Sequence, residues 1–144
     1  MSIIHLCDGQ RNMTFVVWDG EVTGGEWLKH VRELLADPDW PAINRFLVDL
    51  TTVSNTQSIR ENVIREALAI FSENPALLAG KKNAIVARDE FRKAKRFEAS
   101  VARFGTTTIV FNSLDTASIF LGIDVKEAHQ VIERLRSRLR IADD

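Results

Sequence analysis

The sequence predicts an α/β fold, built as one domain around a mostly parallel sheet. Three observations support this prediction: two strand-like runs precede the first helix, β-prone runs then alternate with stretches of helical periodicity, and one strand is a near-continuous apolar run. Such runs are typical of parallel strands that are covered on both faces. With 144 residues and 45% hydrophobic side chains, the chain suits one domain with a sizeable core.

The first two strands are expected at residues 3–7 and 13–19. The Asp8-Gly9 pair that follows the first run is a turn signal. The second run, MTFVVWD, is rich in aromatic and β-branched residues, which favour strands. Together the two runs predict a hairpin with a longer loop, and therefore one antiparallel pair at the edge of the sheet.

Two motifs with the spacing of a capping box mark the first two helices. In this box the hydroxyl accepts from a helix amide and the glutamate reaches back to the cap. Thr23 and Glu26 predict the start of the first helix, and Ser58 and Glu61 predict the start of the second. The apolar run RFLVDL at residues 45–50 lies between them and predicts a buried strand.

The remaining elements continue the alternation and give the order β-β-α-β-α-β-α-β-α-α. They are a strand over 83–88, a helix over 90–104, a strand over 106–111, a short helix that begins at Ser113 or Asp115 and ends at Gly122, and a last helix from Asp124 to about Arg140.

The last helix carries a regular apolar stripe, with charged residues over the rest of its surface. The stripe consists of Val125, Ala128, Ile132, Leu135 and Leu139. It predicts packing against the rest of the same chain or against a second subunit. The second alternative would make the protein a homodimer, the commonest oligomer.

Several strings of the sequence resemble the STAS-like domains, the sulfate transporter and anti-sigma-factor antagonist type that includes the stage II sporulation protein AA-like fold. They are DGEVT after the second strand, FLVDLTTVSN, AIVA before a helix that contains Phe91, and IVFNSLDTASIFL. The resemblance covers residues 1–121 and leaves 122–144 as an added C-terminal amphipathic helix. It implies an open β-α superhelix with about five strands and a non-catalytic role in regulation or protein binding.

The antagonist members of this family carry an Asp-Ser-Ser/Thr-Gly motif, in which a partner kinase phosphorylates the first serine. The resemblance places Ser58 at that phospho-acceptor position. Gln57, Ile59 and Arg60 replace the other three motif residues, so this sequence departs from the pattern. Thr56, Gln57, Ser58 and Arg60 are the resulting candidates for partner binding or phosphorylation. In the alternative interpretation, Ser58 is only the cap of the second helix.

Three carboxylates are expected at the carboxyl ends of strands, the edge at which open α/β sheets bind ligands. Asp19, Glu21 and Asp49 are therefore candidates for lining a ligand crevice. Turn formation and helix capping are the alternative roles. An enzyme that uses Asp19 and Asp49 for acid–base chemistry is the least favoured hypothesis, because no nucleophile or metal ligand is expected nearby.

A carrier function is the alternative to a regulatory one. It would hold a small apolar or anionic ligand between the sheet and its helices. The best reporters of such a ligand would be Trp18, Trp27 and Trp40, although core or loop packing is the favoured interpretation of all three side chains.

Histidine and cysteine usage predicts no metal site and no cofactor. His5, His30 and His129 lie on separate elements, and neither HExxH nor CxxC occurs. Cys7, the single cysteine, excludes an internal disulfide and is expected to be a small buried residue.

Charge and hydropathy limit the partners. The net charge is −1, with 6 basic and 11 acidic side chains in residues 1–79 and 13 and 9 in residues 80–144. This asymmetry is interpreted as two solvated faces, and no nucleic-acid binding is predicted. No apolar run is long enough for a membrane helix, and the first residues do not form a signal peptide. The expected location is the cytoplasm, and the expected partner is a protein.

Overall fold

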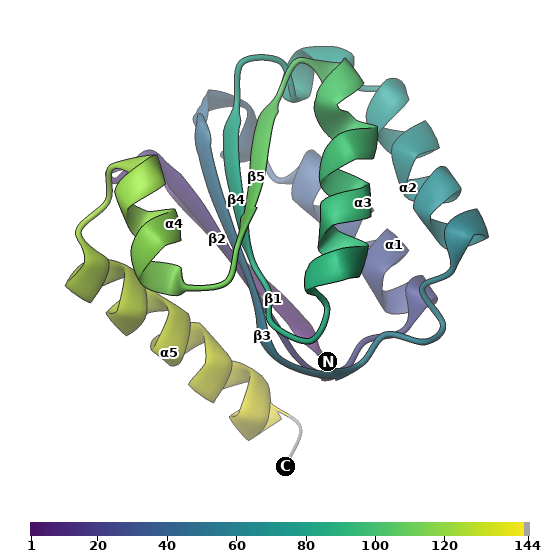
Figure 1. The fold of residues 1–144 in the computed structure, drawn as a ribbon. Coiled ribbons are helices and arrows are strands. Elements are labelled where there is room, and N and C mark those ends of the chain that lie inside the picture. Colours follow the sequence, from purple (N-terminus) through teal and green to yellow (C-terminus); the bar gives the residue numbers. More distant parts are fainter. Residues whose placement is uncertain (143–144) are drawn as a thin grey trace.

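The computed structural model describes residues 1–142 and has strands and helices in the predicted order (Figure 1). The strands are β1 (Ile3–Asp8), β2 (Met13–Glu21), β3 (Arg45–Asn55), β4 (Lys82–Val86) and β5 (Thr107–Phe111). The α-helices are α1 (Gly24–Ala36), α2 (Glu61–Ser72), α3 (Phe91–Val101), α4 (Leu114–Leu121) and α5 (Val125–Ala142). Short 3₁₀ helices lie at Trp40–Ala42, Pro75–Leu77 and Ala102–Phe104.

The five strands form one sheet in the order β1-β2-β3-β4-β5. β1 pairs antiparallel with β2, and all other neighbours are parallel. α1, α2 and α3 connect successive parallel strands, and right-handed crossovers in one direction place all three on the same face. α4 and α5 cover the opposite face, so the fold has three layers (Figure 1). The predicted α/β fold with a mostly parallel, five-stranded sheet is confirmed.

Each central strand contributes to two cores, because alternate side chains point to opposite faces. Val16, Val48 and Ile85 are buried against α1–α3. Val17 and Leu47 are buried against α4 and α5. This burial on both faces explains why the central strands read as almost continuous apolar runs in the sequence.

The capping box predicted for the first helix is present at α1. The Thr23 hydroxyl accepts from the Glu26 amide at 3.2 Å, and the Glu26 carboxylate accepts from the Thr23 amide at 3.3 Å. The strand predicted over 45–50 is longer than expected. β3 continues to Asn55 because Thr52, Val53 and Asn55 pair with the end of β2.

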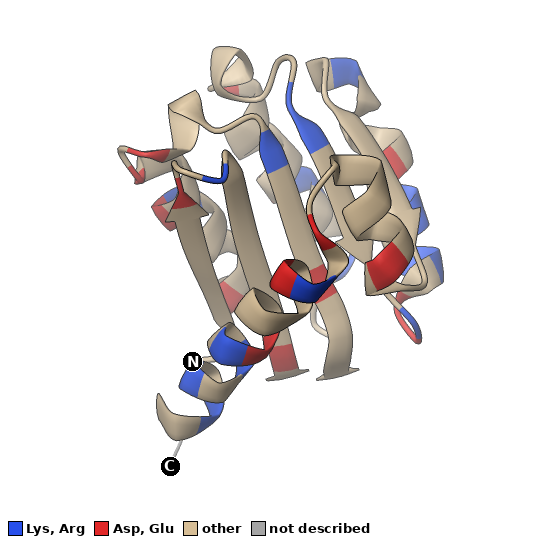
Figure 2. Cartoon of the chain, turned by 90° about the vertical axis from the view of Figure 1, so that its left-hand side faces the viewer, with Lys and Arg blue, Asp and Glu red and all other residues tan. Residues whose placement is uncertain are grey.

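The apolar stripe of α5 packs on the sheet of its own chain. Ala128, Ile132, Leu135 and Leu139 are buried in the core between α5 and the strands. Figure 2 shows α5 crossing the strands obliquely. The division into residues 1–121 and an added segment over 122–144 stays a prediction, and residues 143–144 lie outside the described part. Within residues 1–142, no helix combines the length and the apolar character needed to span a membrane.

Candidate functional site

The three predicted carboxylates and the segment around Ser58 lie toward one edge of the sheet, where the parallel strands end (lower edge in Figure 1). Asp19 and Glu21 lie at the end of β2, and Asp49 lies in β3. The turn over residues 55–60, which we call the 55–60 turn, follows β3 and leads to α2. This is the edge at which open α/β sheets bind ligands.

Hydrogen bonds hold the 55–60 turn against the end of β2. The Val22 amide donates to the Asn55 carbonyl at 2.9 Å, and the Asn55 side-chain amide donates to exposed Glu21 at 2.9 Å. The Gln57 amide donates to the side-chain oxygen of Asn55 at 2.8 Å, and the Ile59 amide donates to the Thr56 carbonyl at 2.9 Å. The turn therefore has a defined conformation.

The predicted capping role of Ser58 is wrong. α2 begins at Glu61, its N-cap is Arg60, and no side chain among residues 1–142 caps it. Ile59 is drawn into the core with 5% of its surface exposed, so the helix starts after the position that the local motif predicts. The exposed Ser58 hydroxyl instead accepts from the Gly24 amide at 2.9 Å, at the first residue of α1.

A close approach between two helices fixes the position of Ser58. A Cβ atom on Gly24 would lie 2.9 Å from a Val63 methyl group and 3.1 Å from the Ser58 carbonyl oxygen. Only glycine allows α1 to start so close to α2 and the 55–60 turn. Ser58 therefore lies beside the positive end of the α1 dipole.

The other members of the turn point in different directions. Gln57 and Arg60 are exposed, whereas Thr56 is buried with 5% of its surface exposed. The Thr56 hydroxyl donates to the Glu90 carboxylate at 2.7 Å, and the Lys93 ammonium donates to the Thr56 hydroxyl and carbonyl oxygens at 2.8 and 2.9 Å. Glu90 and Lys93 were not predicted, because no local pattern links residues so distant in the sequence.

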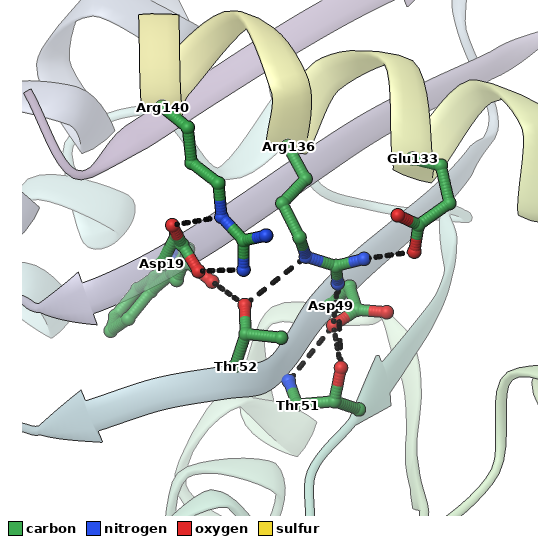
Figure 3. A network of polar contacts seen from close by, with 8 residues as sticks. Asp19, Asp49, Thr51, Thr52, Glu133, Arg136 and Arg140 are labelled. Atoms are coloured by element: carbon green, nitrogen blue, oxygen red, sulfur yellow. Dashed lines mark hydrogen bonds and ion pairs between the residues drawn. The ribbon is translucent and has the colours of Figure 1, made fainter. Parts of the chain in front are cut away.

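Arginines from α5 bind two of the three predicted carboxylates (Figure 3). Arg136 donates to Asp49 at 3.1 Å, and both side chains are buried. Arg140 donates to both oxygens of Asp19, at 3.1 and 3.3 Å. Asp49 also accepts from the Thr51 amide and hydroxyl, at 2.8 and 2.6 Å.

Electrostatics keeps Asp19 ionised. Burial acts to raise the pKa of Asp19, but hydrogen bonds from Arg140 and Thr52, with the charges of Arg140 and Arg136, outweigh this effect and lower the pKa. An ionised carboxylate paired with arginine is a poor general acid. The arrangement holds α5 on the sheet, and the predicted crevice role of these carboxylates stays a prediction.

An apolar cavity of about 150 Å³ lies between the sheet and helices α1–α3. All three tryptophans, Trp18, Trp27 and Trp40, line this cavity. A dry cavity of roughly this size holds a benzene-sized molecule. Thr56 and Ile59 also line it, so the 55–60 turn contributes to both the cavity wall and the outer surface.

Two polar atoms in the cavity wall lack partners. Within residues 1–142, the indole N–H of Trp40 and the side-chain oxygen of Asn83 are buried without a hydrogen bond. Such groups are rare in native interiors, where water or a ligand usually satisfies them. Trp40 and Asn83 thus bring one free donor and one free acceptor to a wall that is mostly apolar. The wall also contains the polar residues His30, Thr56, Glu90, Lys93, Thr106 and Thr108.

Comparisons with known proteins identify the fold. No family model matches the sequence, and no curated protein matches it. Among solved structures, the chain is similar to an uncharacterised DUF3478-family protein with a SpoIIAA-like fold from Shewanella loihica, at 15% identity and a TM-score of 0.52. It is also similar to an anti-sigma factor antagonist from Mycobacterium paratuberculosis, at 20% identity and a TM-score of 0.53. Each match covers 83% of this chain and 94% of the other. The predicted STAS-like fold is confirmed.

Proposed function

We propose that this protein is a non-catalytic regulatory module that binds a partner protein through the 55–60 turn. The observation that carries the proposal is the combination of buried anchors and exposed polar side chains in this turn. Thr56 and Ile59 are buried, whereas Gln57, Ser58 and Arg60 are exposed. A turn held in one conformation loses little entropy when a partner binds it. The likeness of the fold to that of an anti-sigma factor antagonist supports a regulatory role.

Ser58 is the proposed regulatory position within the turn. Its hydroxyl does not cap α2 and instead accepts from the first amide of α1. A phosphoryl group would add a charge of about −1.5 to −2 at a helix N-terminus, where negative charge is favoured. Phosphorylation of Ser58 would therefore change the charge of the binding surface without breaking the fold.

Site-specific photo-crosslinking tests the binding surface. A photoreactive residue at position 57 is compared with the same residue at position 130, since Gln57 and Gln130 are both exposed glutamines. Illumination in cells of the source organism is expected to give one discrete protein adduct from position 57 and none from position 130. Ser58→Asp, which places a negative charge at the surface, is expected to reduce the adduct. Equal adducts from both positions, or none from position 57, would contradict the proposal.

The cavity supports a second candidate function, a carrier of a small apolar ligand with one polar group. Its apolar wall and the free groups of Trp40 and Asn83 favour this function. A ligand would also contact Thr56 and Ile59, behind the proposed binding surface. Neither the turn nor the cavity bears on the formation of a homodimer, which stays a prediction.

A matched pair of alanines on α3 tests the carrier function. Ala94 lines the cavity, whereas Ala99 is exposed. Iodobenzene, a heavy-atom quencher, is expected to quench the tryptophan fluorescence of the wild type and of Ala99→Phe in a saturable manner. Ala94→Phe should fill the space and abolish saturable quenching. Saturable quenching that is the same in both variants would show that the cavity is not the binding site.

A further inference from the structure

We propose that His5, Cys7 and Asp37 bind a divalent metal ion of the Zn²⁺ type between β1 and the end of α1. One nitrogen of His5, the Cys7 sulfur and one carboxylate oxygen of Asp37 all lie within 4.8 Å of one another. Imidazole, thiolate and carboxylate are the three side-chain ligands that Zn²⁺ uses in proteins. This site is separate from the 55–60 turn and does not depend on the proposed function.

The fold brings these residues together from two segments. His5 and Cys7 are two positions apart in β1, so their side chains point to the same face of the strand. α1 packs on β1, and Asp37 is the C-cap residue of this helix. The sequence contains only the His-x-Cys half of the site. The third ligand is supplied by tertiary structure, which explains why ligand spacing alone did not reveal it.

The proposed ligands from β1 each have an outer partner. Nδ1 of His5 lies 3.1 Å from Nε2 of His30, which is buried with 7% of its surface exposed. The hydroxyl of buried Thr14 donates to the Cys7 sulfur at 3.5 Å. Histidine ligands of metals usually donate their second ring N–H to a hydrogen-bond acceptor, which orients the ring and sets its tautomer, and the His30 nitrogen would be that acceptor here.

The contact between His5 and Asp37 is compatible with a bound metal ion. Without a metal, the Nε2–H of His5 can donate to Asp37 at 3.0 Å while Nδ1 accepts from His30 at 3.1 Å. A metal ion would take the place of the Nε2 proton, and Nδ1 of His5 would then donate to His30. The Asp39 amide donates to Oδ1 of Asp37 at 2.9 Å, so Oδ2 is the oxygen that faces His5 and would bind the metal.

The geometry leaves room for a fourth ligand from solvent. Metal–ligand lengths of about 2.0–2.3 Å in a tetrahedral site place the ligand atoms roughly 3.3–3.7 Å apart. Nε2 of His5 and Oδ2 of Asp37 lie 3.0 Å apart, slightly closer than this range, and all three ligand atoms lie within 4.8 Å of one another, so side-chain adjustment would be needed to reach the tetrahedral geometry. The His5 and Asp37 side chains are 18% and 22% exposed, and water can therefore reach the open position.

The chain contains a matched control for this proposal. His129 and Asp115 form a second His–Asp pair, with Nε2 2.7 Å from the carboxylate oxygen. Both side chains are at least half exposed, and no cysteine belongs to this pair. A metal that binds any His–Asp pair would bind at both pairs. A metal that also needs the Cys7 sulfur as a ligand should bind only at His5 and Asp37.

Cobalt titration of the metal-free full-length protein tests the site, because tetrahedral Co²⁺ with a thiolate ligand gives a charge-transfer band. The wild type is expected to bind one Co²⁺ per chain with this band, and Zn²⁺ should displace it. Cys7→Ser should lose the band, and Asp37→Asn should weaken binding at least about tenfold. His30→Gln should weaken binding about 10–100-fold as an outer partner, and His129→Gln should match the wild type.

Alkylation of Cys7 gives a second readout that needs no variant. Added Zn²⁺ is expected to protect the Cys7 thiol of the wild type from iodoacetamide, and a chelator should restore its reactivity.

Circular dichroism checks that each variant is folded. The proposal is overturned if the folded wild type gives no charge-transfer band and no protection. It is also overturned if Cys7→Ser binds Co²⁺ as tightly as the wild type, because the His5–Asp37 contact then holds only a proton.

Discussion

Replacing Arg136 by methionine should destabilise the protein much more than replacing Arg140 by methionine. Arg136 and Asp49 are 7% and 3% exposed, so Arg136→Met leaves a buried carboxylate without its counter-charge. Removing one partner of a buried ion pair costs about 3–5 kcal/mol. Asp49 keeps the two hydrogen bonds from Thr51, which places the expected loss near the lower limit, at about 3 kcal/mol. Arg140 is 59% exposed, so its loss should cost no more than about 1 kcal/mol.

Urea unfolding followed by tryptophan fluorescence measures both effects. With a urea dependence of about 2 kcal/mol/M, Arg136→Met should lower the unfolding midpoint by roughly 1.5 M. Adding Asp49→Asn to Arg136→Met removes the unpaired charge and should recover most of the lost stability. The reasoning is refuted if Arg136→Met costs no more than Arg140→Met, or if the double variant is no more stable than Arg136→Met alone.

Two further predictions concern the polar contacts of His30 and Ser58. Burial, with a smaller effect of His5, lowers the pKa of His30 from 6.5 to about 4. The unfolded chain therefore binds a proton between these pH values that the folded chain does not, so stability should fall by up to about 3 kcal/mol as the pH drops from 6.5 to 4. Urea unfolding in the presence of a chelator should show this loss, and His30→Gln should flatten it. Ser58→Ala should cost about 1 kcal/mol and speed hydrogen exchange at the Gly24 amide, because that amide loses its acceptor. Faster exchange at the start of α2 instead would restore the capping interpretation of Ser58.

The sequence predicted the fold well because its signals are local. The change from strand-like to helical periodicity gives the order of elements, and the right-handed crossover rule then sets the faces on which α1–α3 lie. The capping box at Thr23 was correct because Thr23 is the N-cap residue of α1 and Glu26 lies in its first turn. The same motif at Ser58 failed, because burial of Ile59 moves the start of α2 and the close approach of α1 gives Ser58 another donor.

The candidate site was predicted only in part. The positions of Asp19, Asp49 and the 55–60 turn follow from the parallel topology, which collects strand ends at one edge. Their partners do not, because Arg136 and Arg140 reach them from α5, at the other end of the chain. The cavity likewise depends on how three helices pack on the sheet.

A native mass spectrum of the protein, released gently from cells of its source organism, tests the regulatory proposal most directly. The proposal predicts a complex with a second protein that is lost in Gln57→Arg and retained in the matched Gln130→Arg. A spectrum that holds only the bare chain, or the chain with a small molecule, would contradict the proposed interaction.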